Sequence, residues 1–470
     1  MPSGGRRSAA SGSSNPHGQA AGAAAVRLIL RLSRGAALHS AADPENDGVV
    51  SQPLLPPPHG IKKARAAWRS VGFCSSHLRC TPFHPPGRAR VRENNLTFMT
   101  ERVLITGGAG FIGSHVADEL LRQGYRVRAL DCLDPQVHGS DARRPEYLDP
   151  EVELVVGDVR DRQQLRDALR GVDAVIHLAA KVGVGQSMYQ IVDYTSVNNE
   201  GTATLLEALI ERPVERLVVA SSMSIYGEGL YRDPAGRLVG GADRPREQLE
   251  RHDWELSDPE GGRLSPVATP ESKSPALTSI YALSKYDQER MCLLTGRAYR
   301  IPTVALRFFN VYGPRQALGN PYTGVLAIFA SRLLNRKAPL IFEDGYQQRD
   351  FVNVADIAQA CRLALKQPQA PDHAFNVGGG QSYTIREIAT RMAAVMECPD
   401  IPPEITGRYR VGDIRHCFAD ISLAREKLGY EPKITLEQGL LELAEWLEGQ
   451  EAVDRADEAR RELALRGLTV

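Results

Sequence analysis

The stretch Val103-Leu-Ile-Thr-Gly-Gly-Ala-Gly-Phe-Ile-Gly113 decides the fold of this chain. An apolar strand runs straight into glycines at positions 107, 110 and 113, and a helical pattern starts at the last of them. Glycines suit this place because the chain turns tightly and its backbone must approach a pyrophosphate, which then lies on the helix N-terminus. We therefore predict a dinucleotide site that contains Gly107, Gly110, Phe111, Ile112 and Gly113. A glycine-rich turn without a ligand is the alternative.

Apolar strands and amphipathic helices alternate on both sides of this turn. We predict strands at residues 102–106, 127–131, 153–157, 174–179, 216–221 and 303–309, with helices such as 113–122 and 201–210 between them. Such alternation is typical of βαβ units and a parallel sheet. The predicted fold class is α/β, a doubly wound parallel sheet of the Rossmann type with a smaller C-terminal α/β lobe.

Composition and pattern divide the chain into four parts. Residues 1–98 are rich in Ala, Ser, Gly, Pro and Arg without a sustained period, so we predict a disordered basic extension. A transit peptide, or a translation start placed too far upstream of Met99, are the alternatives. The Rossmann domain is predicted over residues 99–311, with an insertion at 229–275 and with parts of 350–380 returning to it. The second lobe is predicted over 312–349 and 381–447, including a helix over 384–396 capped by Thr384. Residues 448–470 are predicted to form a charged tail whose helix is solvated.

Charge and cysteine content exclude several classes of function. The 57 basic and 57 acidic residues balance, but residues 1–98 hold 13 of the former and 4 of the latter. This excess positive charge lies in a segment without an aromatic platform or a reading helix, so we expect no nucleic-acid partner. The apolar stretches stop short of the roughly 20 residues that cross a bilayer, so we expect no membrane partner. The 7 cysteines show no paired short spacing, which predicts no metal site and a reduced, cytoplasmic setting.

Acidic residues follow the second and third predicted strands. Asp131, 18 residues after Gly113, can bind the adenosine ribose hydroxyls and repel a 2′-phosphate, which favours NAD over NADP. Asp158 and Val159 are expected to meet the adenine ring. Alternatively, Asp158 caps a helix over residues 161–171.

A phenol, an ammonium and a hydroxyl are the candidate catalytic groups. Tyr281 and Lys285 are four residues apart, on one face of a predicted helix. A nearby positive charge stabilises a phenolate, so we expect Lys285 to lower the pKa of Tyr281 toward that of a working general base. Ser222 follows a central strand at the edge where open α/β sheets bind ligands, and it either orients a substrate hydroxyl or caps the local turn.

Several motifs in the expected order resemble one known family. They are TGGAGFIG, HLAA (His177 to Ala180), SSxxxYG ending at Gly227, YxxxK, and RFFNVYGPR (Arg307 to Arg315). From about Arg102 to Trp446 the chain resembles the extended short-chain dehydrogenase/reductases, and among them the nucleotide-sugar epimerases and dehydratases.

The resemblance implies NAD as cofactor, a nucleotide sugar as substrate and a homodimer as the assembly. Tyr281 would be the base, Lys285 would hold the nicotinamide ribose, and Ser222 would orient the substrate. The other implied cofactor contacts are Leu178, Ala179, Ala180 and Asn198. The implied substrate contacts are Asn310, Arg349, Arg410 and Asp413, whose arginines suit phosphate oxygens. Each arginine could instead be an ordinary ion-pair residue.

The residues after Ser222 favour one reaction of this family. Dehydratases carry an acid pair directly after the catalytic hydroxyl, where this chain has Met223 and Ser224. We therefore predict a 4-epimerase, which oxidises C4 and returns the hydride to the opposite face. Tyr281 follows Tyr226 by 55 residues, and this long link resembles a bacterial group of dTDP-L-rhamnose 4-epimerases. A UDP-hexose substrate, a net dehydrogenase, reductase, decarboxylase or dehydratase, and a non-catalytic NAD-binding regulator are the alternatives.

Overall fold

The computed structural model describes residues 101–320, 322, 324–410, 412–450, 452 and 454–469. The predictions made for residues 1–98 lie outside the described residues.

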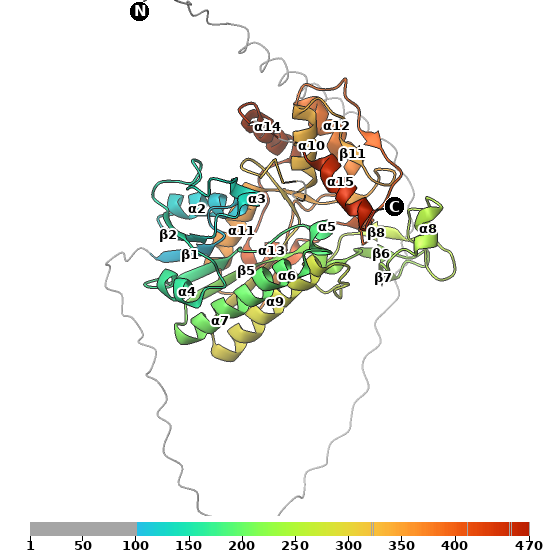
Figure 1. Ribbon diagram of the computed structural model, residues 1–470. Helices are drawn as coiled ribbons and strands as arrows, with labels where there is room; N and C mark the ends of the chain where they lie inside the picture. Colours follow the sequence, from blue (N-terminus) through green and yellow to red (C-terminus); the bar gives the residue numbers. More distant parts are fainter. Residues whose placement is uncertain are drawn as a thin grey trace, which may run out of the picture. The chain divides into compact units, whose positions relative to one another are not determined.

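A seven-stranded parallel sheet lies at the centre of this part of the chain (Figure 1). Its order is β14-β9-β5-β4-β1-β2-β3, and every neighbouring pair is parallel. The strands are β1 (Arg102–Thr106), β2 (Arg126–Asp131), β3 (Glu153–Val156), β4 (Ala174–His177), β5 (Arg216–Ser222), β9 (Thr303–Phe308) and β14 (Ala374–Val377). The order reverses between β1 and β4, which is where doubly wound sheets bind ligands. The predicted fold class is confirmed, and the six predicted strands end within two residues of the observed ones.

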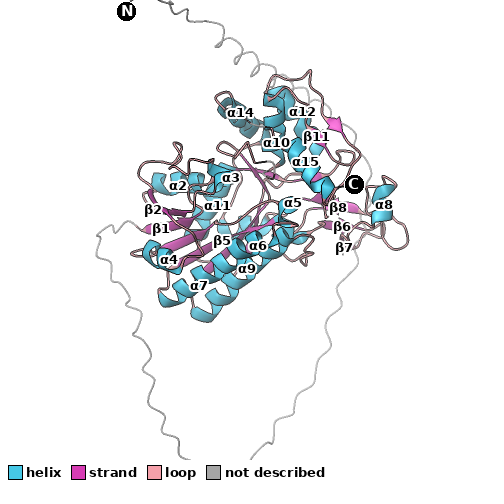
Figure 2. Cartoon of the chain, viewed as in Figure 1, coloured by secondary structure: helices cyan, strands magenta, loops and turns pink. Residues whose placement is uncertain are grey.

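Helices cover both faces of the sheet because the strands are apolar on both sides (Figure 2). Val103 and Ile105 pack in one core cluster with α2 (Phe111–Arg122), α11 (Val354–Lys366) and α13 (Ser422–Leu428). Leu104 points the other way, into a cluster with α4 (Arg162–Ala168), α7 (Gly201–Glu211) and α9 (Ile280–Tyr299). No helix in the described part of the chain is both long and apolar enough to cross a membrane.

A second lobe follows the sheet and has its own core. It contains three small sheets, which pair β10 (Asn310–Tyr312) with β13 (Phe351–Asn353), β11 (Leu340–Ile341) with β16 (Glu404–Ile405), and β12 (Gln348–Arg349) with both β15 (Tyr383–Thr384) and β17 (His416–Cys417). Its helices α10 (Val325–Leu334), α12 (Ile385–Val395) and α14 (Leu436–Leu447) share one apolar cluster. Thr384 caps α12 through a reciprocal capping box with Glu387, so the predicted cap is confirmed.

The predicted insertion is a folded module. Its strands β6 (Leu230–Arg232), β7 (Leu238–Gly240) and β8 (Ser265–Val267) form one antiparallel sheet, and α8 (Arg246–Glu250) lies between β7 and β8 in sequence. Short helical elements complete the described chain: α3 (Pro135–His138), α5 (Val184–Ser187), α6 (Ile191–Tyr194), η1 (Thr195–Glu200) and η2 (Met223–Tyr226).

The C-terminal tail corrects one prediction. Its helix, α15 (Ala456–Leu465), is packed rather than solvated, since Leu463 is buried and an added Cβ at Gly185 would come within 3.2 Å of it. Arg466 lies 4.4 Å from the centre of the Tyr189 ring. The prediction of a solvated helix was wrong because Ala459 and Leu463, four residues apart in a charged segment, bury one face of the helix.

Candidate active site

A cavity of about 580 Å³ lies along the carboxyl ends of the central strands. Its lining includes the predicted residues Gly107, Gly110, Phe111, Ile112, Gly113, Asp131, Asp158, Val159, Leu178, Ala179, Ala180, Ser222, Tyr281 and Lys285. The ends of strands β1 to β5 and the start of helix α9 therefore bring the predicted cofactor and catalytic residues together. We call this the cofactor cavity.

The glycine turn has the geometry of a pyrophosphate cradle. Gly107 has φ 71°, in the left-handed region that favours glycine. A Cβ on Gly113 would lie 2.2 Å from the carbonyl oxygen of Gly107. No side chain caps α2 at Gly110, so the first amides of that helix remain available for an anion. These residues fit the diphosphate of a dinucleotide.

Alanine at two of these glycines is expected to separate folding from cofactor binding. Gly113→Ala should lower Tm, because backbone atoms stand where its Cβ would go. Gly110→Ala meets only the Gly107 oxygen, at 3.4 Å, so we expect a normal Tm and loss of most bound NAD because the methyl group enters the cradle. Tm and the NAD content of the purified protein are the measurements, with Gly449→Ala, which meets nothing within 4 Å, as control. Full NAD content in Gly110→Ala would contradict the cradle.

Asp131 ends β2 at the edge of the cofactor cavity. Its carboxylate accepts hydrogen bonds from the amides of Ala109, at 3.0 Å, and Leu133, at 2.9 Å. Two carboxylate oxygens offer about four lone-pair sites, so acceptor capacity remains for ribose hydroxyls. The arrangement fits NAD and disfavours a 2′-phosphate by like-charge repulsion.

Removing this charge is expected to relax the preference for NAD. Asp131→Asn keeps the shape of the side chain and should reduce discrimination against NADP by at least about tenfold, because repulsion of the 2′-phosphate is lost. Binding of each dinucleotide to cofactor-stripped protein measures this ratio, with the exposed Asp141→Asn as control. Unchanged discrimination would remove Asp131 from the ribose site.

Asp158 lies in the wall of the cavity and is not a helix cap. The N-cap of α4 is Asp161, whose side chain accepts from the amides of Gln163 and Gln164. Asp158 instead pairs with Arg160 at 2.6 Å, and the hydrogen bond from Arg160 lowers the pKa of Asp158. Arg160 also lines the cavity and was not predicted.

Tyr281 and Lys285 start α9, which Ser279 caps by accepting from the amide of Ala282. Burial raises the pKa of Tyr281, and a hydrogen bond with Ser222 acts in the opposite direction. Burial lowers the pKa of Lys285 to about 8. The ammonium of Lys285 donates to Gln288 at 2.6 Å.

The expected depression of the Tyr281 pKa is therefore wrong for this structure. Helical spacing places Tyr281 and Lys285 in the same cavity wall, but burial raises the pKa of the phenol, and the hydrogen bond with Ser222, not the charge of Lys285, is what opposes it. Gln288, three residues after Lys285 on the same helix face, was not predicted. The Gln288 amide donates to Thr202 of α7 at 2.8 Å, so the residue that accepts from Lys285 is itself held by α7.

Ser222 caps the local turn, which is one of the two roles that the sequence left open; the orientation of a substrate hydroxyl stays a prediction. It caps η2, since its oxygen accepts from the amide of Ser224 at 3.2 Å, and it accepts from the Ser224 hydroxyl at 2.9 Å. Because both bonds use lone pairs, the Ser222 proton remains available for donation. Capping holds the hydroxyl where it faces Tyr281.

Asn198 does not line the cofactor cavity, contrary to its implied role as a cofactor contact. It is fully buried in the π-helical turn η1 and accepts from the amide of Lys181 at 2.7 Å. Its own amide donates to Ser284 at 2.9 Å. Asn198 thus holds the cavity-lining segment around Lys181 against α9.

The predicted substrate contacts separate into two pairs. Asn310 donates to the carbonyl oxygen of Asp350 at 2.8 Å, and Arg349 donates to the carbonyl oxygens of Ile414 and Arg415. Neither lines the cofactor cavity or the second cavity described next. Their side chains are engaged by the backbone, a contact that sequence does not reveal.

Arg410 and Asp413 do line a cavity, a second one of about 340 Å³. They pair at 3.0 Å, and the Arg410 guanidinium lies 4.7 Å from the centre of the Phe342 ring. Burial acts to raise the pKa of Asp413, but the charges of Arg410 and Arg349 outweigh it and the pKa is lowered.

A dinucleotide cradle and a Tyr, a Lys and a Ser that line the same cavity of a doubly wound sheet define a nucleotide-dependent oxidoreductase-type site. Residues 103–247 and 257–378 match the model of the NAD dependent epimerase/dehydratase family. The chain belongs to this family, which confirms the predicted resemblance and the NAD cofactor.

The chain is similar to named members of this family over most of their length. It is 36% identical to a dTDP-L-rhamnose 4-epimerase of Burkholderia thailandensis, over 74% of this chain and 95% of that protein. It is 31% identical to the Thermus thermophilus UDP-glucose 4-epimerase whose structure holds NAD, with a TM-score of 0.59 over 74% of this chain and 100% of that one. A UDP-glucuronic acid 4-epimerase of Bacillus cereus, solved with UDP-glucuronic acid and NAD, gives 26% identity, a TM-score of 0.60, and coverage of 74% of this chain and 99% of that one.

Proposed function

We propose that this chain is an NAD-dependent nucleotide-sugar 4-epimerase, with dTDP-L-rhamnose and UDP-hexoses as the substrates to test first. The observation that carries the proposal is that Ser222, Tyr281 and Lys285 line the same cavity as the glycine cradle. A sugar hydroxyl in this cavity lies beside both a proton acceptor and the dinucleotide. The names of the relatives support the choice of substrates.

Each catalytic side chain has one task in the proposed reaction. Tyr281 takes the proton of the C4 hydroxyl, and Ser222 donates to that oxygen and orients it. Lys285 holds the nicotinamide ribose and stabilises the phenolate. NAD, when bound, supplies the hydride acceptor and donor. Tyr281 returns the same proton after the ketone has presented its other face, so inversion needs no further acid or base.

The surroundings of Ser222 disfavour loss of water from the sugar. Met223 and Ser224 are buried beside it, and the Ser224 hydroxyl donates its hydrogen bond to Ser222. Elimination needs an ionisable group to move the protons at C5 and C6, and neither side chain provides one. A 4-keto sugar formed here is therefore reduced again.

A net oxidoreductase is the second candidate, because it would use the same three side chains. The two reactions differ in their cofactor balance: an epimerase regenerates its NAD, whereas a dehydrogenase or reductase consumes it. A non-catalytic regulator is disfavoured, since Ser222, Tyr281 and Lys285 are all present and line one cavity.

The test is to incubate the purified protein, without added cofactor, with UDP, dTDP and GDP sugars and to separate the C4 epimers. We expect dTDP-L-rhamnose or a UDP-hexose to reach an equilibrium mixture at catalytic protein concentration. Conversion that stops after one equivalent and resumes only with added NAD would instead support the net oxidoreductase.

A homodimer and a cytoplasmic setting are part of the proposal. Leu283 and Leu294 are exposed on one face of α9, and Ile191 and Val192 of α6 are exposed as well. Helices α6 and α9 pack against each other, so these side chains offer an apolar patch to a second copy. Sedimentation of the wild type and of Leu294→Lys tests it, with a monomeric wild type as the contradicting result. The cysteines of the described part carry no disulfide, which suits a reduced compartment.

A further inference from the structure

The insertion, residues 229–275, is fastened to the sheet at its C-terminal end. Lys273 donates to the carbonyl oxygen of Tyr226, next to the Ser222 turn. The carboxylate of Glu271 accepts from the amide of Asn376 at 2.7 Å, and its carbonyl oxygen accepts from buried Arg307 at 3.1 Å. The insertion is therefore not a free loop.

Buried ion pairs join the insertion to the second lobe. Arg244 of the insertion is 2.8 Å from Glu343, and both side chains are almost fully buried. Arg415 is fully buried and contacts Glu255 of the insertion, at 2.5 Å, as well as Glu343 and Asp344. Such pairs fix the insertion in one position against the lobe.

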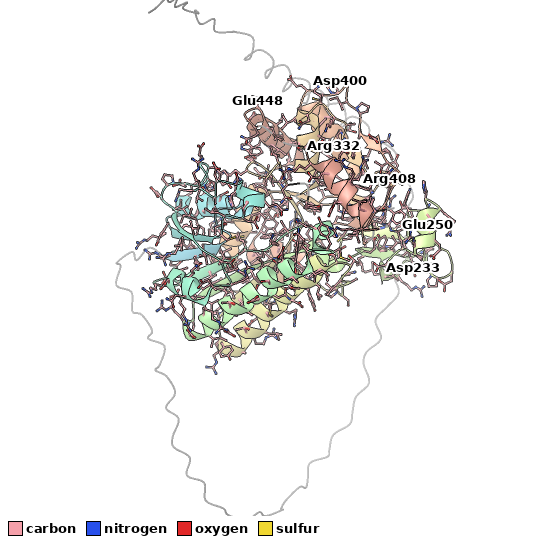
Figure 3. The ribbon with its side chains drawn as sticks, viewed as in Figure 1. Asp233, Glu250, Arg332, Asp400, Arg408 and Glu448 are labelled. Carbon is pink, nitrogen blue, oxygen red and sulfur yellow. The ribbon has the colours of Figure 1, made fainter. Side chains whose placement is uncertain are left out.

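The insertion and the lobe share an aromatic contact beside the second cavity. Leu249 and Trp254 pack with Tyr409 in one buried cluster, and the Trp254 and Tyr409 rings are 6.4 Å apart. Glu250, labelled in Figure 3, ends α8, and Arg408, also labelled, precedes Tyr409. The second cavity is lined from the insertion side by Asp243, Arg244, Arg246 and Leu249, and from the other side by Glu228, Thr278, Tyr409, Arg410, Gly412 and Asp413.

Two side chains of this cavity, Tyr409 and Arg246, carry hydrogen-bond donors that no buried partner uses. Tyr409 is 5% exposed, and its hydroxyl has no hydrogen-bond partner among the described residues. Arg246 pairs only with Glu250, at 2.9 Å, in an exposed contact on the same helix. A buried hydroxyl is normally paired, so the free Tyr409 hydroxyl points to a ligand.

The carboxylates of the cavity do not cancel these donors. Glu228 is used by the amides of Arg415, at 2.6 Å, and His416, at 3.1 Å. Asp413 is paired with Arg410. Asp243 is exposed. The unpaired Tyr409 hydroxyl, together with Arg246, whose one ion pair is exposed to solvent, suits an oxyanion rather than a neutral group.

We propose that the insertion forms one wall of the nucleotide-sugar site, where Arg246 and the Tyr409 hydroxyl bind diphosphate oxygens of the substrate opposite Arg410. This inference rests on the proposed function, because it takes the nucleotide sugar as the ligand. It explains what the insertion adds: a cation that a shorter link between Tyr226 and Tyr281 could not place there.

The test measures nucleotide binding separately from turnover. Calorimetric titration with dTDP, UDP and GDP is expected to give a Kd at least about tenfold higher for Arg246→Gln than for wild type, the change one lost charge-assisted contact produces. Arg251→Gln, an exposed arginine that follows α8 and lies outside the cavity, should stay within about twofold. For the nucleotide sugar, Arg246→Gln should raise KM and leave kcat and NAD content unchanged.

Tyr409→Phe gives an independent arm. Because its hydroxyl has no partner in the protein, we expect Tm to stay constant or rise while the Kd for dTDP increases several-fold. A structural hydroxyl would give the reverse: a lower Tm with unchanged affinity.

The outcomes distinguish this inference from the function on which it rests. A wild type that epimerises while Arg246→Gln and Tyr409→Phe bind and turn over normally overturns the inference and leaves the function standing. If the wild type converts no sugar but Arg246→Gln lowers the affinity for nucleoside diphosphates, the epimerase assignment is overturned and the proposed binding site stands. A wild type that binds no nucleoside diphosphate overturns the inference.

Discussion

Replacing Tyr281 by Phe is expected to lower kcat by about 10²- to 10⁴-fold, which is the usual contribution of a positioned general base. The ring keeps its edge-to-face contact with Tyr194, whose centroid is 6.5 Å away, so the fold and the bound NAD should be retained. Initial rates of C4 epimerisation, together with Tm and NAD content, measure the effect.

A tyrosine outside the cofactor cavity provides the control. Tyr189 also carries a bonded hydroxyl, 2.6 Å from Tyr322, and Tyr189→Phe should keep its rate within a few-fold of wild type. Full activity in Tyr281→Phe would show that another group takes the proton. The role of Ser222 as a donor to the same oxygen would then also need revision.

The largest expected loss of stability follows from Arg415→Met. The guanidinium is fully buried, and its removal leaves Glu343 buried without this partner and Glu255 and Asp344 half-buried. Breaking a buried pair on one side costs about 3–5 kcal/mol of unfolding free energy. Urea unfolding should show this loss, and limited proteolysis should cut faster within residues 229–275, because the contact of Arg415 with Glu255 no longer helps to attach them to the lobe.

An exposed ion pair between an arginine and a glutamate provides the matched control for that variant. Arg425 contacts Glu431 with both side chains more than half exposed, so Arg425→Met should change the free energy of unfolding by about 0–1 kcal/mol. If Arg415→Met were as stable as Arg425→Met, the insertion would not depend on the buried network.

The same network predicts how stability changes in acid. Burial acts to raise the pKa of Glu255, but hydrogen bonds from His416 and Arg415 outweigh it and lower the pKa from 4.5 to about 2. A depressed carboxyl pKa contributes stability above its unfolded value, and this contribution is lost as pH falls through the folded value. Wild type should therefore lose more stability than Arg415→Met between about pH 4.5 and 2.

Features of the fold and the site that depend on short stretches of sequence could be predicted. The cradle glycines, Asp131 after β2 and Ser222 after β5 all lie at strand ends, and parallel strands bring those ends to one edge. Tyr281 and Lys285 meet through helical spacing alone. These local signals predicted the sheet and the lining of the cofactor cavity.

Features that depend on packing between distant segments could not be predicted. Asn198 and Arg349 look like binding residues in sequence, yet their side chains bond to the backbone of segments 17 and more than 60 residues away. The pKa of Tyr281 depends on burial, which the spacing to Lys285 does not report. Arg246 lies in an insertion whose position depends on contacts with distant segments, such as the buried pairs of Arg244 and Arg415.

The most direct test of the central claim is the fate of the hydrogen on C4. A dTDP- or UDP-sugar deuterated at C4, incubated in ordinary water without added NAD, should give the C4 epimer with deuterium still at C4. This result follows if the hydride passes to bound cofactor and returns to the other face while Tyr281 holds the hydroxyl proton. Loss of the deuterium to solvent, or inversion at a carbon other than C4, would contradict the proposed mechanism.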